Sequence, residues 1–147
     1  MERIERPGRL IALLSRVSGA YMARAMRPFG LAAAHYPVLM VLYRRDGLSQ
    51  EELAQDLQVD KSAAKRTVDP LVAAGYVRRE RNPLDRRAYR LYATEKALVV
   101  RPALQAVLDG YEAALSAEFS PAERAAAIDL LNRMARNAVA ARNALDA

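Results

Sequence analysis

The sequence predicts a mainly α-helical fold with about six helices and one small β-hairpin. Apolar residues recur at helical spacing along most of the chain, and two Ser-x-x-Glu pairs mark helix starts. Two short runs rich in aromatic and β-branched residues flank a turn-forming segment, which indicates a pair of antiparallel strands. With 147 residues and a hydrophobic content of 52%, the chain is long enough for one domain with a buried core.

Two helices are expected at the start of the chain. Between Arg9 and about Arg27, apolar residues repeat every three or four positions, which predicts a long amphipathic helix. Pro28 and Gly30 should end it, because both residues disfavour continued helical backbone. A shorter helix follows, with Pro37 in its first turn, where a missing amide has little consequence. Its apolar residues are Tyr36, Leu39, Val41 and Leu42, and Asp46 and Gly47 close it.

The centre of the chain has the pattern of two helices joined by a tight turn. Ser49 and Glu52 form a capping box, so a short helix should run from Ser49 to about Leu57. After a turn at residues 58–60, Asp60 can cap a second helix that ends at Gly75. One face of this second helix is polar near its N-terminus, the end that enters the major groove in a helix-turn-helix. The residues on that face are Lys61, Ser62, Lys65 and Arg66, which could also be a merely exposed helix surface.

A basic β-hairpin should follow the second helix. The strands are expected at residues 76–80 and 88–93, around a loop at residues 81–87 that contains the turn formers Asn82, Pro83 and Asp85. Such a hairpin beside a helix-turn-helix is a wing, so the predicted fold is a winged helix-turn-helix. A solvated charged hairpin is the alternative, but its position favours contact with DNA. The hairpin arginines are Arg78, Arg79, Arg81, Arg86, Arg87 and Arg90.

Two long helices complete the chain. Thr94 can cap the first, and Pro102 inside it predicts a kink near Leu98 or a late start. Ser120 and Glu123 form the second capping box and start a helix that continues to Leu145. One small domain cannot cover all the apolar faces of the outer helices, so the first and last helices should pack against a second chain. The residues expected at that interface are Leu10, Leu14, Leu104, Leu108, Leu131 and Met134.

Composition restricts the function. The net charge of +6 and the pI near 10.0 favour a polyanionic partner. The chain has no cysteine and one histidine, and its acids show no spacing typical of catalysis, so neither an enzyme nor a metal or cofactor site is expected. No apolar run is long enough to span a membrane and no signal peptide is present, so a cytoplasmic location is expected.

The order of elements and several local motifs together resemble the MarR (multiple antibiotic resistance regulator) family of bacterial transcriptional regulators. The resemblance implies a homodimer that binds a pseudo-palindromic operator in double-stranded DNA, as a repressor, and releases it when a small, often aromatic, acid binds. It further implies a DNA-binding lobe at residues 34–93 and dimerisation helices at residues 9–28 and 95–146. The motifs are Gly30-Leu31, Val38-Leu39-x-x-Leu42, Leu53-Ala54, Val59-Asp60-Lys61-Ser62, Leu71-x-x-x-Gly75, and Asp85 with Arg87.

The resemblance also assigns residues to roles. Arg87 matches a wing arginine that enters the minor groove, and Asp85 matches an acid that holds the wing in shape. Because the effector cleft of the family lies between the dimer helices and the DNA-binding lobe, the effector candidates are Arg16, His35 and Tyr36. His35 could equally be a local cap, and Tyr36 a core residue. The complete set of DNA-binding candidates is Ser49, Lys61, Ser62, Lys65, Arg66, Arg81, Asp85, Arg86 and Arg87.

Two residues depart from the family pattern. Pro70 lies inside the second helix of the helix-turn-helix, where it removes an amide hydrogen bond to Arg66 and should bend the helix at a cost of about 3 kcal/mol. Ala97 replaces a frequent glycine at the start of the fifth helix. The alternative function is a winged-helix module for protein interaction or RNA binding without an effector response, because one fold supports several functions.

Overall fold

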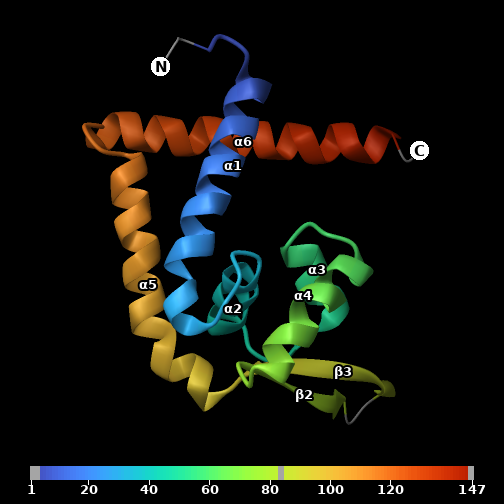
Figure 1. The fold of residues 1–147 in the computed structure, drawn as a ribbon. Helices are drawn as coiled ribbons and strands as arrows, with labels where there is room; N and C mark the ends of the chain where they lie inside the picture. Colours follow the sequence, from blue (N-terminus) through green and yellow to red (C-terminus); the bar gives the residue numbers. More distant parts are fainter. Residues whose placement is uncertain (1–3, 83–84, 146–147) are drawn as a thin grey trace. The chain divides into compact units, whose positions relative to one another are not determined.

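The computed structural model describes residues 4–82 and 85–145, and at residues 85–88 it describes the backbone alone. The chain divides into two compact units, Met1–Val107 and Leu108–Ala147. Most described residues lie in α-helices, and three strands and one 3-10 turn form the remaining regular structure (Figure 1). The prediction of a mainly helical fold with a small wing is therefore confirmed.

The first two helices lie close to their predicted positions. Helix α1 spans Pro7–Ala25 and is followed by a single 3-10 turn, η1, at Arg27–Phe29. Gly30 ends that turn with a φ of +66°, a left-handed conformation that glycine adopts without a steric penalty. Helix α2 spans His35–Arg44, so Pro37 lies in its first turn as predicted. These short connections place α2 directly ahead of the helix-turn-helix.

The helix-turn-helix consists of α3, Gln50–Asp56, and α4, Lys61–Ala73. The turn between them includes Gln58, whose φ of +55° is unusual for a residue other than glycine. At its end, α4 closes in a Schellman motif, because the Gly75 amide donates to the Val72 carbonyl and the Tyr76 amide to the Leu71 carbonyl. The predicted end at Gly75, with a φ of +76°, is confirmed.

Apolar residues of α2, α3 and α4 form the core beneath the helix-turn-helix. Leu39 of α2, Leu53 of α3 and Val68 of α4 are completely inaccessible to solvent. Tyr76 is also buried and donates its hydroxyl hydrogen to the Phe29 carbonyl at 2.6 Å, which ties the end of α4 to η1. Burial of these side chains fixes α4 on the core through one face and leaves the opposite face to solvent. The other buried residues of these helices are Val38, Val41, Leu42, Ala54, Ala64 and Leu71.

The wing belongs to a three-stranded antiparallel sheet, not to the two-stranded hairpin that the sequence predicts. Strands β1 (Leu48–Ser49), β2 (Val77–Asn82) and β3 (Asp85–Ala93) are ordered β1-β3-β2, and Leu48 pairs with Leu91. Two residues are too few for a recognisable strand pattern, which explains why β1 was missed. The expectation of a loop over residues 81–87 is also wrong, because β2 reaches Asn82 and β3 begins at Asp85. Pro83, predicted as a turn residue, lies outside the described residues.

Helix α5, Glu95–Leu115, begins directly after Thr94. The Thr94 hydroxyl accepts from the Ala97 amide at 3.3 Å, so the predicted cap is confirmed and the late start is wrong. Figure 1 shows the helix axis changing direction in the first half of α5, which contains Pro102. Leu104, expected at a dimer interface, is instead fully buried within the single chain. The methyl group of Ala97 is fully buried as well, and its carbonyl accepts from the Tyr43 hydroxyl at 2.6 Å.

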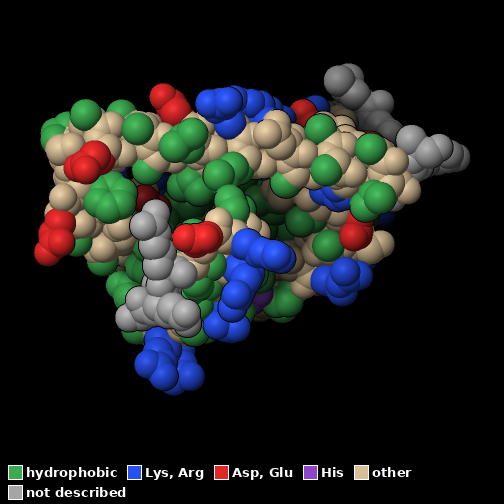
Figure 2. All heavy atoms as spheres, turned by 90° about the horizontal axis from the view of Figure 1, so that it is seen from above, with side chains coloured by type: hydrophobic (Ala, Val, Ile, Leu, Met, Phe, Trp, Pro, Cys, Tyr) green, Lys and Arg blue, Asp and Glu red, His purple; other side chains and the backbone are tan. Residues whose placement is uncertain are grey.

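Helix α6, Pro121–Leu145, starts at the predicted second capping box. The Ser120 amide donates to the Glu123 carboxylate at 2.8 Å, and the Glu123 amide donates to the Ser120 hydroxyl at 3.3 Å. None of its described residues is buried, although the helix is 25 residues long. Hydrophobic side chains are visible among charged ones on the face drawn in Figure 2. The large exposed hydrophobic residues of α6 are Ile128, Leu130, Leu131, Met134 and Leu145.

Candidate nucleic-acid interface

The N-terminal half of α4 presents a polar surface to solvent. Asp60 caps the helix by accepting from the Ala63 amide at 2.7 Å, which satisfies one of the amides left free at a helix start. The predicted DNA-reading residues Lys61, Ser62, Lys65 and Arg66 are all exposed. Within the described part of the chain, Arg66 has no ion-pair partner, so its guanidinium is available to an external anion.

Contacts with α3 hold the start of α4. The Lys61 ammonium lies 2.9 Å from a carboxylate oxygen of Glu51, and both side chains are largely exposed. The Gln50 amide nitrogen also donates to the Lys61 carbonyl at 3.4 Å. These two links join the two helices of the helix-turn-helix at the end that would approach DNA. Part of the positive charge of Lys61 is consequently balanced before any ligand binds.

Ser49 has a structural role as the cap of α3. Its hydroxyl accepts from the Glu52 amide at 3.1 Å, and its own amide donates to the Glu52 carboxylate at 2.8 Å, so the predicted capping box is confirmed. The Glu52 carboxylate also accepts from the Arg45 guanidinium at 3.1 Å. The hydrogen bond from the Ser49 amide, followed by that from its hydroxyl, lowers the pKa of Glu52.

This capping box should make stability depend on pH. Because the folded-state pKa of Glu52 is lowered, its contribution is complete above the unfolded value of about 4.3 and is lost as pH falls through the folded value. We expect Glu52→Gln to lower the melting temperature near neutral pH, with the difference from wild type shrinking as pH falls below about 4. Thermal unfolding followed by circular dichroism across this range checks the prediction. A difference that stays constant with pH would contradict it.

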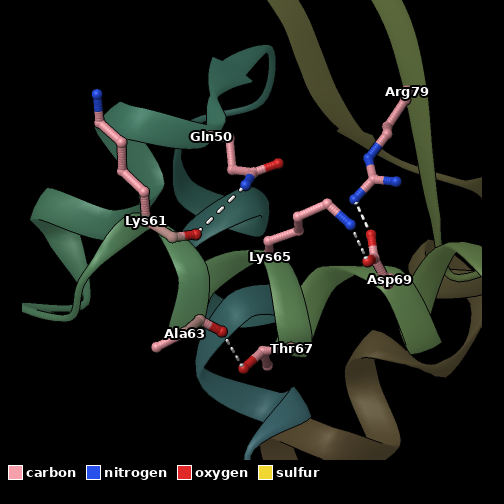
Figure 3. A network of polar contacts seen from close by, with 7 residues as sticks. All are labelled: Gln50, Lys61, Ala63, Lys65, Thr67, Asp69 and Arg79. Atoms are coloured by element: carbon pink, nitrogen blue, oxygen red, sulfur yellow. Dashed lines mark hydrogen bonds and ion pairs between the residues drawn. The ribbon is translucent and has the colours of Figure 1, made fainter.

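One carboxylate joins the exposed helix face to the wing. Asp69 lies one turn beyond Lys65 on α4, and its carboxylate is 2.6 Å from the Lys65 ammonium. Its other oxygen accepts from the Arg79 guanidinium, which comes from β2 (Figure 3). The hydrogen bonds from Lys65 and then from Arg79 lower the pKa of Asp69. Sequence reasoning missed Asp69, although the four-residue spacing from Lys65 is a signal for such a pair.

Among the hairpin arginines whose side chains are described, three form contacts within the protein. The Arg90 guanidinium donates to the Gly47 carbonyl at 2.7 Å, and Arg79 is bound to Asp69. Arg78 stacks over the Tyr92 ring at 4.5 Å and pairs with Glu80. Arg81 is exposed, whereas the side chains of Asp85, Arg86 and Arg87 lie outside the described part of the structure. The charge that the described wing can offer to a partner is therefore smaller than the sequence suggests.

Pro70 interrupts neither α4 nor the exposed face. The helix continues through Pro70 to Ala73 as one element, and the Pro70 carbonyl still accepts from the Ala74 amide at 2.8 Å. Thr67 donates its hydroxyl hydrogen to the Ala63 carbonyl at 3.1 Å, one turn before the proline (Figure 3). The polar residues that face solvent all precede this position, so the candidate surface retains regular helical spacing.

Comparison with known proteins identifies the family of this chain. A model of the MarR family matches residues 29–88, from the end of η1 into β3. A solved MarR transcriptional regulator from Methanosarcina mazei Go1 is 33% identical, with a TM-score of 0.83 over 90% of this chain and 95% of that chain. The chain belongs to the MarR family.

Further relatives support the same assignment. A MarR-family transcriptional regulator from Silicibacter pomeroyi is 30% identical, with a TM-score of 0.72, and covers 87% of this chain and 86% of its own. A candidate transcriptional regulatory protein for the hcr operon of Thauera aromatica is 33% identical over 107 residues, 73% of this chain. The match spans 64% of that relative, so part of its length has no counterpart here. Membership of the MarR family makes the chain a DNA-binding transcriptional regulator and not an enzyme.

The effector candidates of this MarR-family chain are not brought together by any one described cavity. Arg16 lines a hollow of about 260 Å³ along α1, together with Ile4, Arg9, Ala12 and Leu13. His35 and Tyr36 do not line that hollow. The His35 Nδ1 accepts from the Ala32 amide at 3.0 Å, the local-cap alternative considered above, and partial burial lowers its pKa. Over residues 4–82 and 85–145, no helix is long and apolar enough to cross a membrane, and no acid, histidine or cysteine cluster could hold a metal ion.

Proposed function

We propose that this MarR-family protein is a sequence-specific repressor that binds a pseudo-palindromic operator as a homodimer. The observation that carries the proposal is the capped N-terminal half of α4, whose basic and hydroxyl side chains are exposed on the second helix of a helix-turn-helix. A helix in this position enters the major groove, and two copies related by a twofold axis read two half-sites. Binding over a promoter then blocks transcription.

The proposed contacts divide into two groups. Ser62 and Arg66 reach base edges, because both are exposed and Arg66 has no ion-pair partner among the described residues. Lys61, Lys65, Arg81 and Arg86 position the protein on phosphates, a role in which partial neutralisation of the two lysines by neighbouring acids is tolerated. The Ser49 hydroxyl accepts from the Glu52 amide and can also donate its hydrogen to a phosphate. Arg87 enters the minor groove of the adjacent segment, with Asp85 holding the wing in shape, as the family resemblance implies.

The dimer is proposed to form through the outer helices, within residues 9–28 and 95–146. Large hydrophobic residues of α1 are substantially exposed in the single chain, among them Leu14 at 46% and Val17 at 53%. Helix α6 has no buried described residue, and Leu131 is 52% exposed. Exposed apolar surface on this scale is typical of an interface between copies, and a twofold dimer covers the same face on both.

A gel shift with duplexes from the protein's own promoter region tests the function. We expect one fragment to be bound far more tightly than a scrambled duplex, with log affinity falling linearly with log salt by about 0.9 per phosphate contacted. Transcription in vitro from the same promoter should fall as protein is added. Equal affinity for every duplex, or a response insensitive to salt, would contradict sequence-specific DNA binding and favour the interaction or RNA-binding alternative.

Effector release is a further part of the proposal, resting on the family resemblance and on cations such as Arg16. An aromatic carboxylate such as salicylate should dissociate a preformed complex, because a ligand that prefers the free conformation shifts the equilibrium away from DNA. Titration of aromatic acids into the complex, followed by fluorescence anisotropy, measures the effect. Benzyl alcohol, which lacks the carboxylate, is the control. A broad panel without any release would leave the protein a constitutive repressor.

A further inference from the structure

Asp69 connects the two parts of the protein that meet DNA in the proposed function. Its carboxylate binds Lys65 on its own helix and Arg79 on the first strand of the wing (Figure 3). The Arg79 side chain is only 27% exposed, and its guanidinium is held at the Asp69 carboxylate of α4. Among the described ion pairs, the Asp69–Arg79 pair is the one that joins α4 to β2.

On charge alone, Asp69 should weaken the binding of this protein to DNA. An acid beside an exposed basic helix face repels phosphate and neutralises part of the charge of Lys65, so its removal should improve attraction to any duplex. The geometry gives the opposite expectation for a cognate site. A helix in the major groove and a wing in the adjacent minor groove must have a fixed separation and angle to engage the same segment. The charge-assisted hydrogen bond from Arg79 restrains that relation, and the one from Lys65 on the same helix holds the carboxylate in place.

We propose that Asp69 is a positioning residue for operator recognition. Its carboxylate, oriented by Lys65 of the same helix, fixes α4 against the wing through Arg79, so that helix and wing reach their grooves together. This inference rests on the proposed sequence-specific function and assigns a source of its specificity. Non-specific binding needs only positive charge near phosphates, so it gains nothing from the restraint. Asp69 therefore raises the ratio of specific to non-specific affinity while lowering overall attraction to DNA.

The test compares Asp69→Asn with a variant of the same charge change. Glu51→Gln also removes one exposed acid paired with a lysine of α4, but this acid lies on α3 and has no described contact with the wing. Affinity of the intact protein is measured by fluorescence anisotropy at matched salt, for the promoter duplex and for a scrambled duplex of equal length. Glu51→Gln should tighten both complexes and leave their ratio unchanged. Asp69→Asn should tighten the scrambled complex and weaken the promoter complex, lowering the ratio roughly tenfold, within the range for one mismatched base pair.

The ratio separates positioning from a loss of folding. A variant that is partly unfolded loses active protein equally for both duplexes, so the ratio stays constant. An unchanged ratio for Asp69→Asn would overturn the proposal, whether both affinities rise or both fall. If the wild-type protein itself shows no preference for any promoter duplex, the proposed function fails, which is a different outcome from failure of the Asp69 variant alone.

A double-mutant cycle identifies the partner through which Asp69 acts. Arg79→Gln removes the other end of the link and should also lower the ratio, although it reduces non-specific affinity through loss of a positive charge. Combining Asp69→Asn with Arg79→Gln should lower the ratio little further, because either change alone breaks the link. Fully additive effects of the two substitutions on the ratio would contradict a role of Asp69 through Arg79.

Discussion

A variant with Leu131→Glu and Met134→Glu is expected to be a monomer and to lose operator affinity by roughly a hundredfold or more. A monomer binds only one half-site, so it loses the affinity gained when a dimer binds both half-sites in one complex. Both residues lie on α6, where they are 52% and 38% exposed in the single chain. Two carboxylates there remain hydrated in a monomer but are buried without partners in a dimer interface. The single chain should therefore stay folded while association fails.

The matched control is Arg136→Glu. It lies on the same helix and alters net charge by the same amount, but at 3.6 residues per turn it is on nearly the opposite side from Leu131 and Met134. Sedimentation equilibrium at micromolar concentration should give a dimer for wild type and Arg136→Glu, and a monomer for the double variant. Circular dichroism verifies folding. A wild-type monomer would contradict the proposed dimer, and a dimeric double variant would place the interface elsewhere.

Arg66→Ala should weaken operator binding by roughly ten- to a hundredfold and relax base preference at one position of each half-site. Arg66 is exposed on the DNA-facing half of α4, and among the described residues it has no ion-pair partner. Its guanidinium can therefore form two hydrogen bonds with a guanine edge without first breaking a contact within the protein. The loss should be concentrated on the cognate duplex.

Lys61→Ala is the comparison for Arg66→Ala. Lys61 is also exposed on α4, but its ammonium is already paired with Glu51, so it should contribute mainly to phosphate attraction. We expect a loss of similar size on promoter and scrambled duplexes. Anisotropy titrations against duplexes substituted one base pair at a time distinguish the two variants. If Arg66→Ala lowers both affinities equally, Arg66 contacts phosphate and the base contact is made elsewhere.

Local physical chemistry decides those features that the sequence predicts correctly. Ser49 and Glu52 form a capping box within four consecutive residues, and Gly75 closes α4 with bonds to its last turn. These interactions depend on neighbours along the chain and on backbone preferences, so spacing alone predicts them. Apolar periodicity similarly predicts the face of α4 that carries Val68, and with it the opposite, exposed face. The helix-turn-helix and the position of its polar surface can therefore be predicted from the sequence.

Contacts between different secondary-structure elements decide the features that the sequence does not predict. Strand β1 exists because Leu48 pairs with Leu91, and Leu104 is buried because other elements cover it. The arginines of the wing are chemically equivalent in the sequence, yet Arg90 binds the Gly47 carbonyl and Arg79 binds Asp69. The first of these hydrogen bonds joins residues 43 positions apart in the sequence. Which groups meet depends on how the sheet packs beside α4, which no spacing rule encodes. Sequence alone thus determines where the basic charge of this protein lies, and the tertiary structure decides how much of it is left for DNA.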